Sequence, residues 1–180
     1  MQSVGSIGVL LSAIQKEFDT SLAAVQWIGL MGSIMLSSLS LGFGRAGDLF
    51  GRRTIFKTGL ALYTAGAGLA ALSGTFSYLL ASRCVMALGL AMAAPMAGAI
   101  IASVHGHDPR GRALGLLAAS IALGRTTGPT IGGAILQLWG WRAVFLANCI
   151  FGVATCVTMF LIFKGREERY KVSVDYLGVL

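Results

Sequence analysis

Charge is scarce in this sequence, and acidic charge is scarcest. Lys, Arg, Asp and Glu make up 12% of the 180 residues, about half of the roughly 25% that is usual in soluble domains. Seven Asp and Glu stand against 14 Lys and Arg, and 56% of all residues are hydrophobic. This composition excludes an ordinary water-soluble domain and favours a membrane protein.

Other absences exclude several functional classes. The three cysteines, Cys84, Cys149 and Cys156, all fall inside apolar segments and predict neither a disulfide framework nor a metal site. No basic run is interleaved with aromatic residues, so the positive charge does not indicate binding to nucleic acid. No nucleophile with a neighbouring base and no phosphate-binding loop can be assembled, so we expect neither an enzyme nor a bound cofactor.

Long runs without a charged residue divide the chain. Four of them contain the roughly 20 residues that cross the hydrocarbon core of a bilayer, at 20–44, 58–82, 84–107 and 143–163. A further run at 113–141 is interrupted only by Arg125, and a short run at 1–15 has the form of a span cut at its front end. We therefore predict an all-α membrane protein with six transmembrane helices, the first truncated, at about residues 1–15, 23–43, 56–74, 77–104, 113–138 and 142–163.

Basic residues gather on one side of this predicted bundle. Most lie in the connections after the second and fourth helices or in the tail, whereas the opposite side has only Lys16 and Arg142. By the positive-inside rule, the basic loops and the C-terminal tail are cytoplasmic. We expect a multi-pass protein of the cell membrane, with a six-helix unit at 1–163 and a cytoplasmic linker leading into a further helix at 164–180. The basic tail suits anionic lipid headgroups.

The connection after the second predicted helix reads GRAGDLFGRRTIF from Gly44. Gly44, Gly47 and Gly51 permit a tight reversal of the chain. Asp48 lies between arginines and can accept charge-assisted hydrogen bonds. From these residues alone, a polar turn with basic flanks explains the segment equally well.

Glycine recurs along the fifth predicted helix. Gly124, Gly128 and Gly132 are four residues apart and share one face, so we expect another helix to approach closely there. Pro129 lacks an N–H and crowds the carbonyl of Arg125, which predicts a bend beside the only charge of this helix. The pattern is typical of membrane transporters.

The connection resembles a signature of the major facilitator superfamily. It matches the cytoplasmic loop signature of that family at Gly44, Asp48, Gly51, Arg52 and Arg53. The position after the aspartate departs from the signature, because an apolar leucine stands where the family usually has a basic residue. The resemblance implies that this loop latches two six-helix halves together and switches as a carrier alternates.

The glycine-rich helix resembles the antiporter motif of the same family. The match has no gap and covers Gly115, Gly124, Gly128, Pro129, Gly132 and Gly133. The segment from Trp139 is similar to the start of the sixth span in drug:proton antiporters, and the segment from Asp175 to the entry of the extra helices in the fourteen-span branch. The chain thus resembles the N-terminal half of such an antiporter. This implies proton-coupled efflux of drugs or other small hydrophobic or cationic compounds, with a C-terminal half or another chain as partner.

Two arginines lie inside predicted spans, where a charge is costly and marks a polar path or a paired site. Arg83 matches the arginine of the family's fourth span, although Met86 and Ala87 replace the Gln-Gly that usually follows. It lies about 10 Å from the outer face at 1.5 Å per residue, so snorkelling is the alternative. Arg125 lies near the midplane and either lines the central cavity or caps the carbonyls that Pro129 loosens.

No acidic residue falls inside a predicted span. Proton-coupled carriers need a membrane group that gains and loses a proton, normally an Asp or Glu. Either the coupling carboxylate lies outside this sequence, or this half alone does not couple. Two alternatives to efflux therefore stay open. One is an importer or sugar-type porter of the same fold, and the other is a non-transporting membrane scaffold or degenerate remnant.

Overall fold

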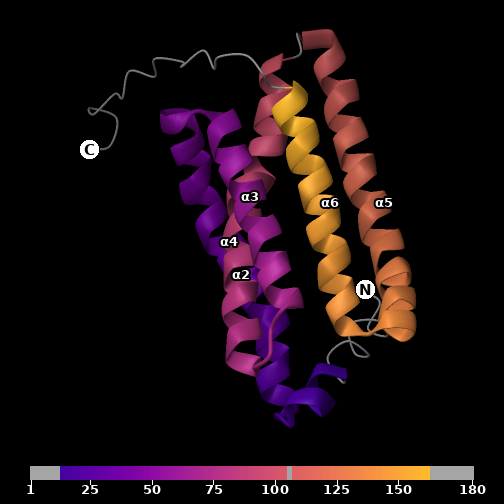
Figure 1. Cartoon of the computed structure of the whole chain (residues 1–180). Helices are drawn as coiled ribbons and strands as arrows, with labels where there is room; N and C mark the ends of the chain where they lie inside the picture. The colour runs from indigo at the N-terminus through magenta and orange to yellow at the C-terminus, as the bar shows by residue number, and fades with distance from the viewer. Residues whose placement is uncertain (1–12, 105–106, 163–180) are drawn as a thin grey trace.

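The computed structural model describes residues 13–104 and 107–162. A short helical segment at residues 13–18 comes first. The long helices follow as α2 (Leu22–Phe50), α3 (Arg52–Ala71), α4 (Phe76–Val104), α5 (His107–Trp139) and α6 (Trp141–Ile162). They run side by side, and α5 lies at the edge of the bundle (Figure 1). The predicted all-α fold is confirmed for these residues, whereas most of the first predicted span and the predicted linker lie outside them.

The number of separate membrane spans agrees only in part with the prediction of six. Within the described residues, three stretches are long and apolar enough to cross a membrane: Ala23–Phe50, Phe76–Ser103 and Arg110–Leu161. The third stretch runs through both α5 and α6. Helix α3 is not among them, because it begins with basic residues and continues with many Gly, Ala and Thr residues. The described residues therefore form apolar helices of membrane-spanning length in three stretches, where the sequence predicted six spans.

Helix α2 continues through the segment that we predicted to be a loop. It ends at Phe50, and Gly51 alone separates it from α3, with φ 99° and ψ 124°. Gly47 is helical and buried, and a Cβ there would meet Met96 of α4. The loop prediction from Gly44 is thus wrong, because Gly47 serves the packing of α2 on α4 and only Gly51 adopts a conformation that L side chains resist.

Helices α3 and α4 approach each other through glycines. A Cβ built at Gly59 of α3 would lie 2.7 Å from the carbonyl oxygen of Gly89 on α4. Near the other end of α3, a Cβ at Gly66 would lie 2.8 Å from the backbone N of Met86. Neither helix could come this close with side chains at these positions, so small residues fix the pairing of α3 with α4.

The core is small and lies toward the end of the bundle where α6 begins. Its fully buried large side chains include Ile14, Ile28, Leu79 and Phe145, which come from the first helical segment, α2, α4 and α6. Elsewhere, large apolar side chains on α2, α5 and α6 are exposed within the chain. Such a surface needs lipid or protein to cover it.

Candidate functional site

The turn between α2 and α3 holds an ion pair that reaches a third helix. Arg52 donates from Nε and Nη2 to the same oxygen of Asp48, at 3.0 Å and 2.8 Å. Its Nη1 donates to the backbone carbonyl of Ala99 on α4, at 3.3 Å. Asp48 is one turn before Arg52, so one guanidinium joins the last turn of α2, the first turn of α3 and a turn near the C-terminal end of α4. The structure thus brings together three of the predicted signature residues: Asp48, Gly51 and Arg52.

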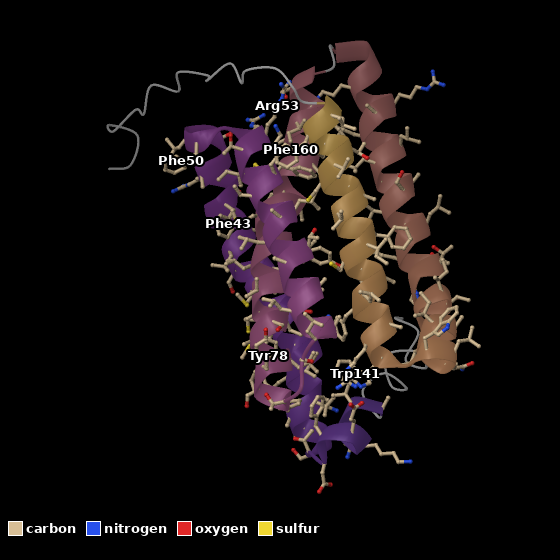
Figure 2. All side chains as sticks on the ribbon, viewed as in Figure 1. Phe43, Phe50, Arg53, Tyr78, Trp141 and Phe160 are labelled. Carbon is tan, nitrogen blue, oxygen red and sulfur yellow. The ribbon has the colours of Figure 1, made fainter. Side chains whose placement is uncertain are left out.

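The other two signature residues, Gly44 and Arg53, lie on α2 and α3 on either side of this turn. Arg53 lies at the same end of the bundle as Phe160, opposite Trp141 (Figure 2). Gly44 is one helical turn before Asp48, and a Cβ there would meet nothing within 4 Å. One turn after Arg53, Lys57 places its Nζ 5.3 Å from the centre of the Phe160 ring. A basic side chain of α3 therefore contacts the last turns of α6 at this end.

The opposite end of the bundle holds a second polar cluster, which sequence reasoning missed. Glu17 accepts a hydrogen bond from the indole N–H of Trp141 and pairs with Arg142 at 2.5 Å. Arg142 also donates to the carbonyl oxygen of Ser73, at 3.2 Å, and stacks over the Trp141 ring. Phe18 packs beside the same ring, with centroids 5.7 Å apart. We call Glu17, Ser73, Trp141 and Arg142 the end clasp, because they join the first helical segment, the link between α3 and α4, and the start of α6.

The end clasp changes the acidity of its carboxyl group. The hydrogen bond from Trp141 and the charge and hydrogen bond of Arg142 hold the pKa of Glu17 below its ordinary value of 4.5, although partial burial acts in the opposite direction. Glu17 lies outside the three apolar stretches named above. Because its pKa is lowered, Glu17 is charged at neutral pH, and this charge holds the first helical segment against α6.

Arg83 occupies the interior between α3, α4 and α6. Its guanidinium lies 5.5 Å from the centre of the Phe145 ring, and Tyr63 of α3 is its electrostatic neighbour. The Tyr63 hydroxyl donates to the side chain of Asn148 at 3.0 Å. Arg83 makes no ion pair with any described carboxylate. A cation with aromatic contacts and a nearby phenol is thus present about one-quarter of the way along α4.

The predicted antiporter residues all lie on α5, and within the described residues no helix packs on four of the five motif glycines. A Cβ placed at Gly115, Gly124, Gly128 or Gly132 would meet nothing within 4 Å. Pro129 is inside the helix, and Arg125 is exposed. The close helix approach that we predicted for this face therefore has no counterpart in the described part of the chain.

Close approach occurs instead at glycines that sequence reasoning passed over. Helices α3 and α4 meet at Gly59, Gly66 and Gly89. Gly152 of α6 lies against Thr64 of α3. A signal for α3 was present, because Gly59 and Gly66 are seven residues apart and therefore share a face. The end clasp had no such signal, since Glu17 and Arg142 are 125 residues apart.

Comparison with known proteins gives a consistent set of relatives. The chain is 28% identical over 168 residues to the riboflavin transporter RibZ of Clostridioides difficile, covering 93% of this chain and 37% of that protein. It is 29% identical to the methylenomycin A resistance protein of Bacillus subtilis, covering 97% and 38%. It is also 29% identical to the tetracenomycin C resistance and export protein of Streptomyces glaucescens, covering 97% and 32%. The chain thus spans about a third of the length of these relatives.

The family assignment rests on a match over nearly the whole chain. The sequence profile described as Major Facilitator Superfamily matches residues 1–175. The signature turn at Asp48, Gly51 and Arg52 and the apolar helices are consistent with that match. The chain belongs to the Major Facilitator Superfamily.

Proposed function

We propose that the chain forms one half of a proton-coupled exporter of drugs or other small hydrophobic or cationic compounds. The observation that carries this proposal is the unbroken antiporter motif on α5, whose glycines at 124, 128 and 132 have open space around them in the described part of the chain. Two relatives are named for resistance to methylenomycin A and for resistance to and export of tetracenomycin C. These names favour efflux over the other activities that the fold supports.

The proposal includes an arrangement in the cell membrane. Six helices would span it as a unit at residues 1–163, with the signature turn and the tail on the cytoplasmic side and the end clasp on the outer side. The basic residues on one side of the chain support this orientation. A second set of helices, from a C-terminal half or another chain, would complete the central cavity. Relatives about three times as long as the shared region support this completion.

The signature turn would act as the movable latch of this transporter. Asp48 and Arg52 are half-exposed, so their ion pair contributes little stability by itself. The ion pair would instead fix the position of the turn, because Arg52 also contacts α4, a helix of the proposed cavity. When the two halves close on the cytoplasmic side, Asp48 and its neighbouring arginines would exchange partners across the interface.

Proton coupling would need a carboxylate from outside these 180 residues. The three acids with described side chains, Glu17, Asp19 and Asp48, all lie at or near helix ends, and residues 1–12 contain no acid. Arg83 and Arg125 would supply the polar groups of the path in this half. A positive site of this kind favours a proton-carrying group on the opposite half.

An accumulation assay tests the proposal. The complete open reading frame that encodes the chain is expressed in an efflux-deficient host, and retention of ethidium is measured with and without a protonophore. We expect lower retention that the protonophore reverses. An Asp48→Asn variant, matched by Asp19→Asn as a control, should lose efflux while keeping its abundance in the membrane. Retention equal to that of the empty host would contradict the proposal.

Uptake by an importer of the same fold is a second candidate, and the name of one relative suggests riboflavin as a substrate with which to test it. RibZ, which matches 93% of this chain, is named as a riboflavin transporter. The same strain can be supplied with labelled riboflavin, and the initial rate of accumulation compared with that of the empty host. A rise in riboflavin accumulation together with unchanged ethidium retention would favour uptake over efflux.

A further inference from the structure

Three polar side chains lie at one depth between α3, α4 and α6. Tyr63 is eight residues before the end of α3, and Arg83 and Asn148 are seven residues after the starts of α4 and α6. At 1.5 Å per residue, all three are about 10–12 Å from the helix ends that adjoin the end clasp. Each side chain is half-buried. Polar groups inside a membrane bundle depend on one another for hydrogen bonds, so the bonding within this layer has a direction that can be followed.

The direction starts at the amide of Asn148. Its Nδ2 donates to the backbone carbonyl of Val144, one turn back on α6, at 2.8 Å. A carbonyl oxygen only accepts, so turning the amide over would set two oxygens against each other. The Asn148 Oδ1 therefore faces Tyr63 and accepts its hydroxyl proton, at 3.0 Å. Since a phenol has a single proton, the Tyr63 oxygen offers only lone pairs to its other neighbours.

Arg83 is the neighbour that can use those lone pairs. A guanidinium has donors and no acceptor, and in the described part of the chain Arg83 makes no hydrogen bond or ion pair. It lies over the ring of Phe145, which is 2% exposed, with Tyr63 as its electrostatic neighbour. A Tyr63 proton directed at the guanidinium would repel it, whereas lone pairs attract it. Asn148 thus sets the sign of the interaction between Tyr63 and Arg83.

A second position is open to the Arg83 side chain. Its Cα is about 10 Å from the outer end of α4, near enough for the guanidinium to snorkel along the helix to the membrane surface. The Phe145 ring alone leaves the N–H donors without a hydrogen-bond acceptor. The Tyr63 oxygen therefore decides between the interior position and the surface.

We propose that Asn148 is a positioning residue for Arg83. By accepting the Tyr63 proton, it turns the Tyr63 lone pairs toward the guanidinium and holds the guanidinium over Phe145, away from the surface. This role rests on the proposed function, in which Arg83 supplies a polar group of the transport path. Asn148 acts on that path through Tyr63, since its own hydrogen bonds go to Tyr63 and Val144.

Chemical modification of arginine tests the position without depending on transport. The complete protein, purified in detergent, is treated with phenylglyoxal, which reacts with accessible guanidinium groups, and the modification of Arg83 is followed by peptide mass spectrometry. Tyr63→Phe removes the hydroxyl, and Asn148→Leu removes the amide at similar volume. Each should raise the modification rate of Arg83 by roughly twofold to tenfold, the population change that one hydrogen bond supplies. The double variant should react no faster than the faster single variant, because both changes break the same chain of bonds.

Two control variants separate position from loosened packing. Tyr78→Phe removes an exposed phenol from α4. Thr155→Val removes a hydrogen bond to a carbonyl one turn back on α6, as Asn148→Leu does. Both should leave Arg83 as protected as in the wild type. Modification of Arg142, which is exposed, should be the same in every variant.

Ethidium efflux by the same variants connects the position to transport. Tyr63→Phe, Asn148→Leu and the double variant should slow efflux to the same extent, and the two controls should not slow it. Wild-type protection of Arg83 in Tyr63→Phe and Asn148→Leu would overturn the proposal, and so would additive increases in the double variant. If the wild type moves no ethidium but Arg83 still becomes reactive in both variants, the proposed function fails while the positioning role stands.

Discussion

Gly51 shows how much a single residue decides at the turn between α2 and α3. Its φ of 99° lies in the left-handed half of the map, where a side chain costs about 1–3 kcal/mol. We expect Gly51→Ala to destabilise the protein by that amount and to loosen the contact of Arg52 with α4. Thermal unfolding of the full-length protein in detergent measures the change.

Gly44→Ala is the matched control for Gly51→Ala. Gly44 is helical and open, so an alanine there should be neutral or stabilise α2 by up to about 1 kcal/mol, the difference between Gly and Ala in helix propensity. Equal effects of the two substitutions would show that the positive φ of Gly51 is not what makes glycine necessary.

The end clasp makes stability depend on pH through Glu17. Its pKa is lowered in the folded protein, so the stabilisation is fully present above about pH 4.5 and is lost as the pH falls through the folded pKa. We expect Glu17→Gln to lower the Tm slightly at pH 7, by the equivalent of no more than about 1 kcal/mol because solvent screens the pair. The difference from wild type should vanish in strong acid.

Asp19→Asn provides the comparison for Glu17→Gln. Asp19 is two residues further along and makes no ion pair within the described residues. A Tm difference between wild type and Glu17→Gln that stays constant from pH 7 to pH 3 would contradict a role for the Glu17 charge.

At the scale of helices, the pairing of α3 with α4 depends on small residues. A Cβ on Gly89 would collide with the backbone of Gly59 and Tyr63, and backbone cannot move aside as a flexible side chain can. We expect Gly89→Ala to cost at least the roughly 1–3 kcal/mol typical of overpacking. Fluorescence-detected unfolding in detergent measures this loss.

Gly98→Ala serves as the control on the same helix. A Cβ at Gly98 would meet nothing within 4 Å, so alanine there should leave the unfolding midpoint unchanged or raise it slightly. A Gly89→Ala protein as stable as Gly98→Ala would mean that α3 and α4 are not held at glycine contact.

The sequence predicted the elements better than it predicted their contacts. The predicted ranges of α4 and α6 differ from the observed ones by no more than one residue at either end, because a long apolar segment in lipid must satisfy its backbone hydrogen bonds internally, as a helix does. The end of α2 was misplaced because Gly44 and Gly47 were interpreted as turn residues, whereas only Gly51 turns. The end clasp was out of reach, since it joins residues far apart in sequence. The resemblance of the α5 motif identified the family, but it did not say which helix covers that face.

At the scale of the whole molecule, the open face of α5 is where we expect a further helix to pack. We expect Gly128→Leu, in the complete reading frame, to abolish ethidium efflux, because the added side chain would keep another helix from packing on this face. Efflux and membrane abundance are measured together, so that loss of transport is separated from loss of protein.

Ala119→Leu is the matched control for Gly128→Leu. It adds bulk at an exposed position nine residues away on α5, which is half a turn around the helix from Gly128. Efflux should persist in this variant. Normal efflux by Gly128→Leu would show that no helix packs closely on that face.

The short link between α3 and α4 has a consequence for how the protein is made. Only residues 72–75 join these two helices, and their glycine contacts need no other part of the chain, so the hairpin can form as soon as both helices have left the ribosome. Helix α6 emerges later and brings Phe145 to Arg83. During synthesis, Arg83 is therefore without its aromatic neighbour until α6 has been made.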